Sequence, residues 1–205
     1  MRCCAWMLLG SVFAAGIVYA DDGGLSKQEA DKGFVSLFDG KTLNGWQGDV
    51  KGYTVENGVI VCQKKKGRNL YTAKEYANFI FRFEFKLEPG ANNGVGIRAP
   101  LTGTASFSGM EIQILDDGHP KYKSWLKDYQ CHGSIYGVVP AKRGFLKPIG
   151  EWNRQEILAD ARHIKVTLNG TVIVDADLDT VKPVDHQEHP GLQNKKGYKI
   201  GRAHV

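Results

Sequence analysis

Helical periodicity is almost absent from this sequence. Beyond residue 20, apolar side chains recur every two residues and hardly ever every 3.6, and only residues 26–31 and 121–128 could form a short helix. A period of two is typical of β-strands, because successive side chains point to opposite faces. In Phe79–Glu88, phenylalanine and leucine alternate with mainly charged residues, which predicts one buried and one solvated face. With no internal repeat, the pattern predicts a single all-β domain and excludes a helical bundle.

Cysteine is also scarce. The chain has four cysteines, and two of them, Cys3 and Cys4, lie at the extreme N-terminus. Cys62 and Cys131 are the other two, so at most one disulfide joins them in an oxidising compartment. Two separate buried thiols are the alternative, and the sequence leaves both open.

Long apolar runs are missing except at residues 5–18. This run follows Arg2 and ends at a small-residue cleavage site before Asp21, which predicts a secretory signal peptide over residues 1–20, cleaved near Ala20. The run is short for a membrane span, so we expect no stable membrane insertion after cleavage, and an uncleaved anchor is the alternative. We therefore expect export to the periplasm or the outside of a bacterial cell, with a linker at 21–32.

The chain carries no large excess of either charge. Its formal net charge is +5, and much of the basic excess lies in Lys64–Arg68, between two strand-like segments. A basic turn of this kind is usually a solvated loop. No aromatic residues are interleaved with it and no binding motif accompanies it, so a nucleic-acid partner is not expected.

Turn signals divide the chain into short strands. Asn57-Gly58 and Asn169-Gly170 each separate two strand-like segments, and this dipeptide favours tight two-residue hairpins. The further strand candidates are Val95–Arg98, Met110–Leu115, Ser134–Val138 and Gln155–Ala159. Strands at this spacing with glycine-rich connections predict a jelly-roll β-sandwich.

One strand candidate carries polar side chains. In Gly109–Gly118, Glu111 and Gln113 share a face, with isoleucines on the opposite face. Asp116 joins the same face only if a bulge near Leu115 inserts one residue. Carboxylate and amide groups along one sheet face indicate the floor of a sugar-binding cleft; a half-solvated strand is the alternative.

Seven segments of the chain, in order, resemble those of the 3-keto-disaccharide hydrolase domain, formerly a domain of unknown function. They are Gly33–Trp46, Asn92–Arg98, Glu111–Asp116, Gly133–Gly137, Gly150–Asn153, Leu168–Gly170 and His189–Leu192. The resemblance covers residues 33–199. It implies a concanavalin A-like jelly roll of two curved antiparallel sheets, bacterial export, and activity on glycosides oxidised at C3, with an oligosaccharide or glycoside as the partner.

The polar strand is also similar to that of laminarinase-type retaining glycosidases, which read Glu-x-Asp-x-x-Glu. The equivalent positions here are Glu111, Gln113 and Asp116. Gln113 carries no charge, and Asp116 is shorter than Glu by about 1.5 Å. Retention needs the two carboxyl groups about 5 to 5.5 Å apart, so an ordinary double displacement is disfavoured. A laminarinase-like hydrolase and a non-catalytic carbohydrate-binding module remain the alternative functions.

A ketone at C3 opens a different route. It would acidify the proton on C2, so that elimination of the C1 oxygen and addition of water cleave the glycosidic bond. This chemistry needs a base, a donor to the enolate oxygen and an acid for the leaving group. We assign these roles as follows: Glu111 is the base, Arg98 and Tyr136 are the donors, Asp116 or His132 is the acid, and Gln113 holds a sugar hydroxyl.

Several of these residues have simpler interpretations. Arg98 could pair with a surface acid, and Tyr136 could be an aromatic residue at the core edge. Trp125 lies in the most loop-like stretch and is the best candidate for sugar stacking; Trp46 and Trp152 fit the core better.

A cofactor is not required by this sequence. His119 with Asp116-Asp117 could bind a divalent cation in the cleft. The segment from Asp185 to His189 holds two histidines and two acids, but His-x-x-His in a loop is a poor zinc signal. We therefore assign no residue as a metal ligand, and a divalent cation in the cleft stays a hypothesis.

The C-terminal residues 200–205 depart from the family pattern. That pattern calls for another glycine-rich strand pair after Lys199. Ile200–Val205 instead matches one reading frame of a common sequencing adapter, so we expect a non-native tail in place of lost strands. A sandwich truncated in this way would leave an unpaired sheet edge.

Overall fold

The computed structural model describes residues 6–7, 25–63 and 67–204. Most of the predicted signal peptide, at 1–5 and 8–20, lies outside these ranges, as do the first residues of the predicted linker and Lys64–Lys66 of the basic turn. No helix within the described ranges is long and apolar enough to span a membrane.

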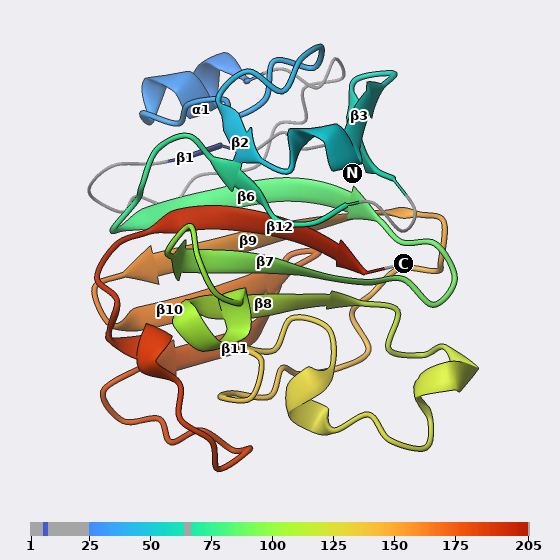
Figure 1. Cartoon of the computed structure of the whole chain (residues 1–205), viewed down its shortest axis with the longest axis vertical. Helices are drawn as coiled ribbons and strands as arrows, with labels where there is room; N and C mark the ends of the chain where they lie inside the picture. The colour runs from blue at the N-terminus through green and yellow to red at the C-terminus, as the bar shows by residue number, and fades with distance from the viewer. Residues whose placement is uncertain (1–5, 8–24, 64–66, 205) are drawn as a thin grey trace.

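The described residues form two five-stranded antiparallel sheets and a separate hairpin (Figure 1). The back sheet has the order β1(Trp6–Met7), β6(Phe79–Lys86), β9(Trp152–Asp160), β10(His163–Leu168), β11(Thr171–Asp177). The front sheet has the order β2(Trp46–Gly48), β5(Leu70–Thr72), β12(Tyr198–His204), β7(Asn92–Ala99), β8(Met110–Leu115). The hairpin pairs β3(Tyr53–Glu56) with β4(Val59–Cys62). The predicted jelly-roll sandwich of two antiparallel sheets is confirmed.

A single apolar layer joins the two sheets. On β6, Phe79, Phe81, Phe83 and Phe85 are buried, and the rings of Phe81 and Phe83 stack with centroids 5.0 Å apart. They belong to the same cluster as these residues of the front sheet: Val95, Ile97, Met110, Ile112 and Ile114. Burying each such side chain stabilises the fold by about 1.5–3 kcal/mol. Because strand side chains alternate, this layer also determines which residues of β7 and β8 face outward.

Both predicted hairpin turns are present. Asn57 and Gly58 have φ of 50° and 74°, and Asn169 and Gly170 have φ of 49° and 88°. Positive φ at both central residues is what a tight turn between twisted strands requires. The first turn joins β3 to β4, and the second joins β10 to β11.

Two local predictions differ from the structure. Residues 121–128 do not form an α-helix: the segment begins inside the 3₁₀ turn η2(Pro120–Tyr122) and ends at the first residue of η3(Asp128–Gln130). Tyr122 is buried, and its hydroxyl donates to Gly90 O at 2.9 Å. Residues 134–138 form only isolated bridges, from Ile135 to Ile112 and Val139. Glycines in the left-handed conformation lie on either side, with φ of 80° at Gly133 and 77° at Gly137, and end any regular pairing.

The remaining helical segments are short. They are α1(Lys27–Asp31), α2(Ala105–Ser108), η1(Val50–Gly52) and η4(Pro190–Gln193). In Figure 1, α2 lies beside the start of β8, and it contacts both β7 and β8. It therefore flanks the outer face of the front sheet.

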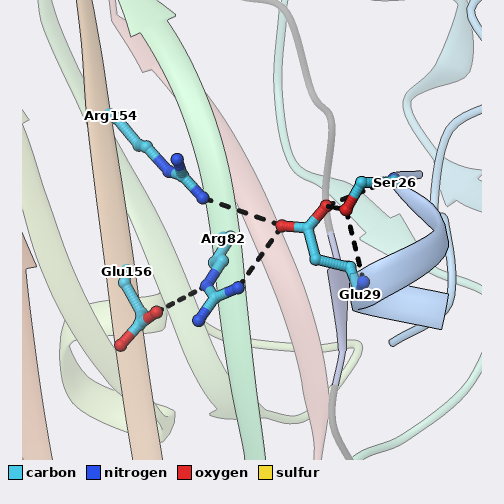
Figure 2. Close-up of polar contacts among 5 residues, drawn as sticks. All are labelled: Ser26, Glu29, Arg82, Arg154 and Glu156. Carbon is cyan, nitrogen blue, oxygen red and sulfur yellow. Dashed lines mark hydrogen bonds and ion pairs between the residues drawn. The ribbon is translucent and has the colours of Figure 1, made fainter. Parts of the chain in front are cut away.

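The predicted linker is docked on the back sheet. Its residues 27–31 form α1, which begins at a capping box between Ser26 and Glu29. Glu29 Oε1 lies 3.3 Å from Arg82 Nη1 and 3.7 Å from Arg154 Nη2, and Arg82 Nε lies 2.5 Å from Glu156 Oε2 (Figure 2). One glutamate thus caps the helix with one oxygen and contacts two arginines of the sheet with the other.

The two cysteines are separate thiols. Cys62 is half-buried at the end of β4, and Cys131 is buried after η3. Burial raises the pKa of both thiols, that of Cys131 to about 11. Of the two alternatives left open by the sequence, the structure therefore contains the free thiols.

Strand β12 lies inside the front sheet, between β5 and β7. The backbone of the expected non-native tail pairs with β7, with Arg202 opposite Gly94 and His204 opposite Asn92. The edge strands of this sheet are β2 and β8. The loss of further strands stays a prediction.

Lys199 on β12 is buried in the core, with 1% of its surface exposed. Its ammonium lies 4.2, 4.1 and 4.7 Å from the ring centroids of Tyr76, Phe79 and Phe81. Such contacts favour the cation, but burial disfavours it more and lowers the pKa of Lys199 to about 7. The fold therefore contains a lysine that is only partly protonated near neutral pH.

Replacing Glu29 with Gln should loosen α1 without unfolding the sandwich. The variant removes the carboxylate charge that Arg82 and Arg154 share, while Arg82 keeps its contact with Glu156, at a cost of about 1 kcal/mol for a half-buried pair. We expect faster amide hydrogen exchange in residues 27–34. The control is Asp31→Asn, because the Lys27–Asp31 pair is exposed. Equal exchange in the wild type and Glu29→Gln would show that this contact does not hold α1.

Lys199 should make stability depend on pH. Between about 7 and 10.5 the unfolded chain binds more protons at Lys199 than the folded chain, so the free energy of unfolding should rise with pH across this window. Lys199→Met should flatten this rise in urea unfolding measured from pH 7 to 10.5. Lys196→Met, at a surface lysine, is the control. An unchanged slope in Lys199→Met would contradict the perturbed lysine.

Candidate active site

The pairing of β7 with β8 determines the outer face of the front sheet. Gly94 lies opposite Gln113, and Gly96 lies opposite Glu111. Val95, Ile97, Met110, Ile112 and Ile114 point into the core. By alternation, the outward positions are Asn92, Gly94 and Gly96 on β7 and Glu111, Gln113 and Leu115 on β8. The predicted common face of Glu111 and Gln113 therefore exists and points away from the core.

The side chain of Glu111 lies across β7. A Cβ atom built on Gly94 would lie 2.6 Å from Cδ and 2.7 Å from Cγ of Glu111, and closer still to Oε1. The carboxyl group therefore occupies the space above Gly94, beside the outward position of Gln113. Glu111 is half-buried, so its carboxyl group is supported by the sheet and still reached by solvent.

Tyr136 comes to the same face from the segment that borders β8. Its backbone N–H donates to Glu111 O at 2.9 Å, and Ile135 next to it pairs with Ile112. This register places Tyr136 beside Glu111, where cross-strand neighbours have Cβ atoms about 4.5–5.5 Å apart. The Tyr136 hydroxyl accepts from Gln130 Nε2 at 2.8 Å, and a hydroxyl that accepts one bond keeps its own proton for donation.

Gln113 and Asn92 extend this polar surface along the strands. Gln113 Nε2 lies 3.5 Å from Asn92 Oδ1, at the long limit of a hydrogen bond. Gln113 is largely covered, and Asn92 is half-buried. Gln113 is directly opposite Gly94, and Asn92 lies further toward the Leu115 end of β8, so the two amides continue the polar surface beyond the Glu111 carboxyl group.

Arg98 does not join this face. It has φ of 50°, a left-handed conformation that interrupts the alternation of β7. Its side chain is buried: Nε donates to Ala77 O at 3.0 Å and Nη1 to Ala161 O at 2.6 Å. Arg98 therefore joins the start of β6 to the β9–β10 turn.

Asp116 is also held elsewhere. The β7–β8 register continues without a shift to Leu115, so the bulge that would align Asp116 with Glu111 is not formed. The Asp116 carboxylate is buried and accepts from Gly90 N–H at 2.7 Å. It fixes the loop that precedes β7.

His132 lies inside the sandwich. Its ring stacks on Phe85 with centroids 5.2 Å apart; Nδ1 accepts from Leu115 N–H at 3.2 Å, and Nε2 lies 3.0 Å from Gln155 Oε1. Because Nδ1 accepts, the proton is on Nε2 and is donated to Gln155. Burial lowers the pKa of His132 to about 4, so the imidazole is neutral at pH 7.

Trp125 is the exposed aromatic residue that the sequence suggested for stacking. Half of its surface is exposed, and its ring packs edge-on against Tyr122 with centroids 5.5 Å apart. Trp125 Nε1 donates to Lys121 O at 2.9 Å, which fixes the indole on its loop. The loop follows the Leu115 end of β8, so Trp125 is beyond the amide end of the polar surface.

The residues considered for a cation are not gathered into a metal site. Among the described residues, no three His, Cys, Asp or Glu side chains come together in a way that could hold a metal ion. His119 caps η2, accepting from Lys121 N–H at 3.2 Å, and its neighbour Asp117 lies 3.7 Å from Arg143. His186 has φ of 60° and is exposed.

His189 and Asp185 form a buried pair that sequence reasoning did not separate from its neighbours. His189 Nε2 lies 3.0 Å from Asp185 Oδ2, and Nδ1 lies 3.1 Å from Ser106 O. Both ring nitrogens therefore have an oxygen within hydrogen-bonding distance. Asp185 N–H donates to Gly137 O at 3.1 Å, so the pair supports the turn after Tyr136.

Gly94 is the other residue that the sequence analysis missed. The sequence does contain a signal for it, since Gly94 and Gly96 occupy alternate positions of one strand. Glycine weakens a strand, so its presence there often indicates that another group approaches the backbone closely. That signal does not say which side chain makes the approach.

A family model for the 3-keto-alpha-glucoside-1,2-lyase-like domain matches residues 33–200. The chain belongs to this family. The family resemblance predicted from the sequence is therefore confirmed, with nearly the same bounds.

The similar proteins carry related names. A 3-keto-disaccharide hydrolase of Bacteroides thetaiotaomicron is 30% identical and covers 62% of this chain, which spans 52% of that protein's length. Two crystal structures from Parabacteroides distasonis, both of proteins with an inferred glycosyl hydrolase assignment, have the same fold. The first has a TM-score of 0.73 and 25% sequence identity, and the match covers 88% of this chain and 92% of that chain. The second has a TM-score of 0.67 and 28% sequence identity, and the match covers 79% of this chain and 87% of that chain.

Proposed function

We propose that this chain is an exported hydrolase that cleaves the glycosidic bond of 3-keto-glycosides. The observation that carries the proposal is the Glu111 carboxyl group, placed on the outward face of the front sheet between Tyr136 and Gln113. Family membership and the name of the Bacteroides relative support the substrate class. The N-terminal apolar run supports export.

The proposed reaction has two stages. In the first, Glu111 removes the proton from C2 of the 3-keto sugar, the electron pair forms an enolate with the C3 carbonyl, and the bond from C1 to the glycosidic oxygen breaks. The leaving oxygen takes up a proton and departs as an alcohol. In the second, water adds to C1 of the resulting enone and a proton returns to C2. The sum is hydrolysis, without a glycosyl-enzyme intermediate.

Glu111 is suited to carry the proton through both stages. It is the one carboxylate at the outward positions of the described β7 and β8. Having taken the C2 proton, it holds that proton near C1 and can pass it to the leaving oxygen. Asp116 and His132, whose side chains are bonded inside the protein, are then not needed as the acid.

Tyr136 and Gln113 supply the neutral contacts. The Tyr136 hydroxyl, oriented by Gln130, would donate to the oxyanion that develops at C3. The Gln113 amide would bind a sugar hydroxyl, and Trp125 would stack on the sugar at the far end of the surface. Arg98, which bonds to two backbone carbonyls, has no part in this scheme.

A laminarinase-like double displacement fits this geometry less well. It needs a second carboxyl group about 5 to 5.5 Å from the first on the same face. The residue expected there, Asp116, accepts from Gly90 N–H beyond the end of the strand. A non-catalytic module would use the same surface but would release no product, and turnover separates the two.

Replacing Glu111 with Gln should abolish cleavage of a 3-keto-disaccharide. The amide keeps the shape but cannot take the C2 proton, so we expect a loss of at least about 10²-fold in kcat. Glucose release from matched native and 3-keto-disaccharides measures it, with Glu84→Gln on the opposite sheet as the control. Full activity in Glu111→Gln would refute the proposal. Equal cleavage of the native and the 3-keto-disaccharide by the wild type would favour a conventional hydrolase. Binding of the sugar without turnover would favour a carbohydrate-binding module.

Replacing Tyr136 with Phe should lower kcat by about 10-fold or more while changing KM little, because the hydroxyl acts mainly on the developing oxyanion. Steady-state kinetics on the same 3-keto substrate give the two constants. Tyr129→Phe is a matched control, since its ring packs edge-on against Tyr136. A rise in KM with unchanged kcat would instead assign Tyr136 to ground-state binding.

A further inference from the structure

Gly94 and Glu111 are not directly opposite each other in the sheet. The direct partner of Glu111 is Gly96, and Gly94 lies two residues further along β7, opposite Gln113. The Glu111 side chain therefore leans diagonally along β7, and all three atoms nearest to a Cβ at Gly94 belong to it: Cγ, Cδ and Oε1. The carboxyl group rests where position 94 has no side chain.

The backbone at Gly94 does not itself require glycine. Gly94 is not among the residues with positive φ, so an L-residue could adopt its conformation. The three atoms nearest to the added methyl group all belong to one flexible side chain, that of Glu111. By contrast, a Cβ at Gly197 would lie 2.4 Å from the backbone carbon of Arg98. A substitution at Gly94 thus displaces Glu111 and leaves the chain path as it is.

We propose that Gly94 is a positioning residue that determines where the Glu111 carboxyl group lies. This inference rests on the proposed function, in which Glu111 is the base. An alanine at 94 excludes the carboxyl group from its place over β7 and moves it by more than 1 Å relative to Gln113 and Tyr136. A displacement of that size costs about 10²-fold in rate when proton transfer depends on alignment. The backbone register that places Gln113 and Tyr136 does not depend on position 94 carrying no side chain, so we expect substrate binding to change little.

The consequence is a split between the kinetic constants. Gly94→Ala should lower kcat on a 3-keto-disaccharide by about 10- to 100-fold and change KM by less than about 3-fold. Gly118→Ala is the matched control, because its Cβ would lie at an ordinary 3.9 Å from Asp116 Oδ1 and its φ is not positive. Gly118→Ala should have wild-type constants.

A double-mutant cycle with Glu111→Asp separates positioning from a general effect on the strand. Aspartate lacks one methylene, so its carboxylate is withdrawn from the space that alanine at 94 would fill. Gly94→Ala should therefore reduce kcat much less in the Glu111→Asp background than in the wild type. If Gly94→Ala reduced kcat by the same factor in both backgrounds, the inference would be overturned. A wild-type kcat in the single variant Gly94→Ala would also overturn it.

Thermal unfolding of each variant completes the experiment. If Gly94→Ala fails to fold but the double variant with Glu111→Asp folds, the added methyl group clashes with Glu111, as inferred. If both variants fail to fold, the steric clash is with another part of the protein, and the inference is overturned. Failure of the proposed function is distinguishable, because either the wild type would then show no preferential cleavage of the 3-keto-disaccharide or Glu111→Gln would keep full activity. An inactive Glu111→Gln beside a normal Gly94→Ala would remove only the role of Gly94.

Discussion

The packing of the phenylalanine row of β6 against the apolar residues of β7 and β8 is the interaction on which the rest depends. It joins the two sheets, and it determines which residues of β7 and β8 face the core and which face outward. Once Val95 and Ile112 point inward, Gly94 and Glu111 must point outward. A shift of one residue would bury Glu111 in hydrocarbon, at a cost no neighbouring group offsets. The candidate site is thus a consequence of the core.

Polar residues in this sandwich have two distinct uses. Glu111 and Tyr136 are half-buried, and the largely covered Gln113 lies beside them at an outward position of β8. Arg98 and His132 are fully covered and satisfy backbone or amide groups between elements. A buried polar group needs partners within the protein, and those partners occupy the atoms that chemistry would need. Residue type alone does not separate these uses; the face on which a side chain lies and the partners that it bonds do.

The surroundings of the polar surface are held by contacts from distant parts of the chain. The pair of His189 and Asp185 joins α2 to the turn after Tyr136. On the opposite side of the sandwich, Glu29 holds the N-terminal helix to β6 and β9 (Figure 2). The helix and the proposed reaction therefore use opposite outer faces, and a change in one should leave the other intact.

Local pattern was enough to predict the longer strands, such as β6, β8, β9 and β10, together with both Asn-Gly hairpins, the helix at residues 26–31 and the shared face of Glu111 and Gln113, because alternation and turn chemistry act over a few residues. It did not predict the short strands β2 and β5 or the place of β12 inside the front sheet. It was not enough to place Arg98, Asp116 or His132. The positive φ of Arg98, the unbroken register before Asp116 and the enclosure of His132 arise from contacts between segments far apart in the chain. The sequence by itself determined which strand carries the Glu111 carboxylate. Tertiary packing decided which polar residues lie beside it, because burial and the backbone conformation at Arg98 depend on how the two sheets pack together.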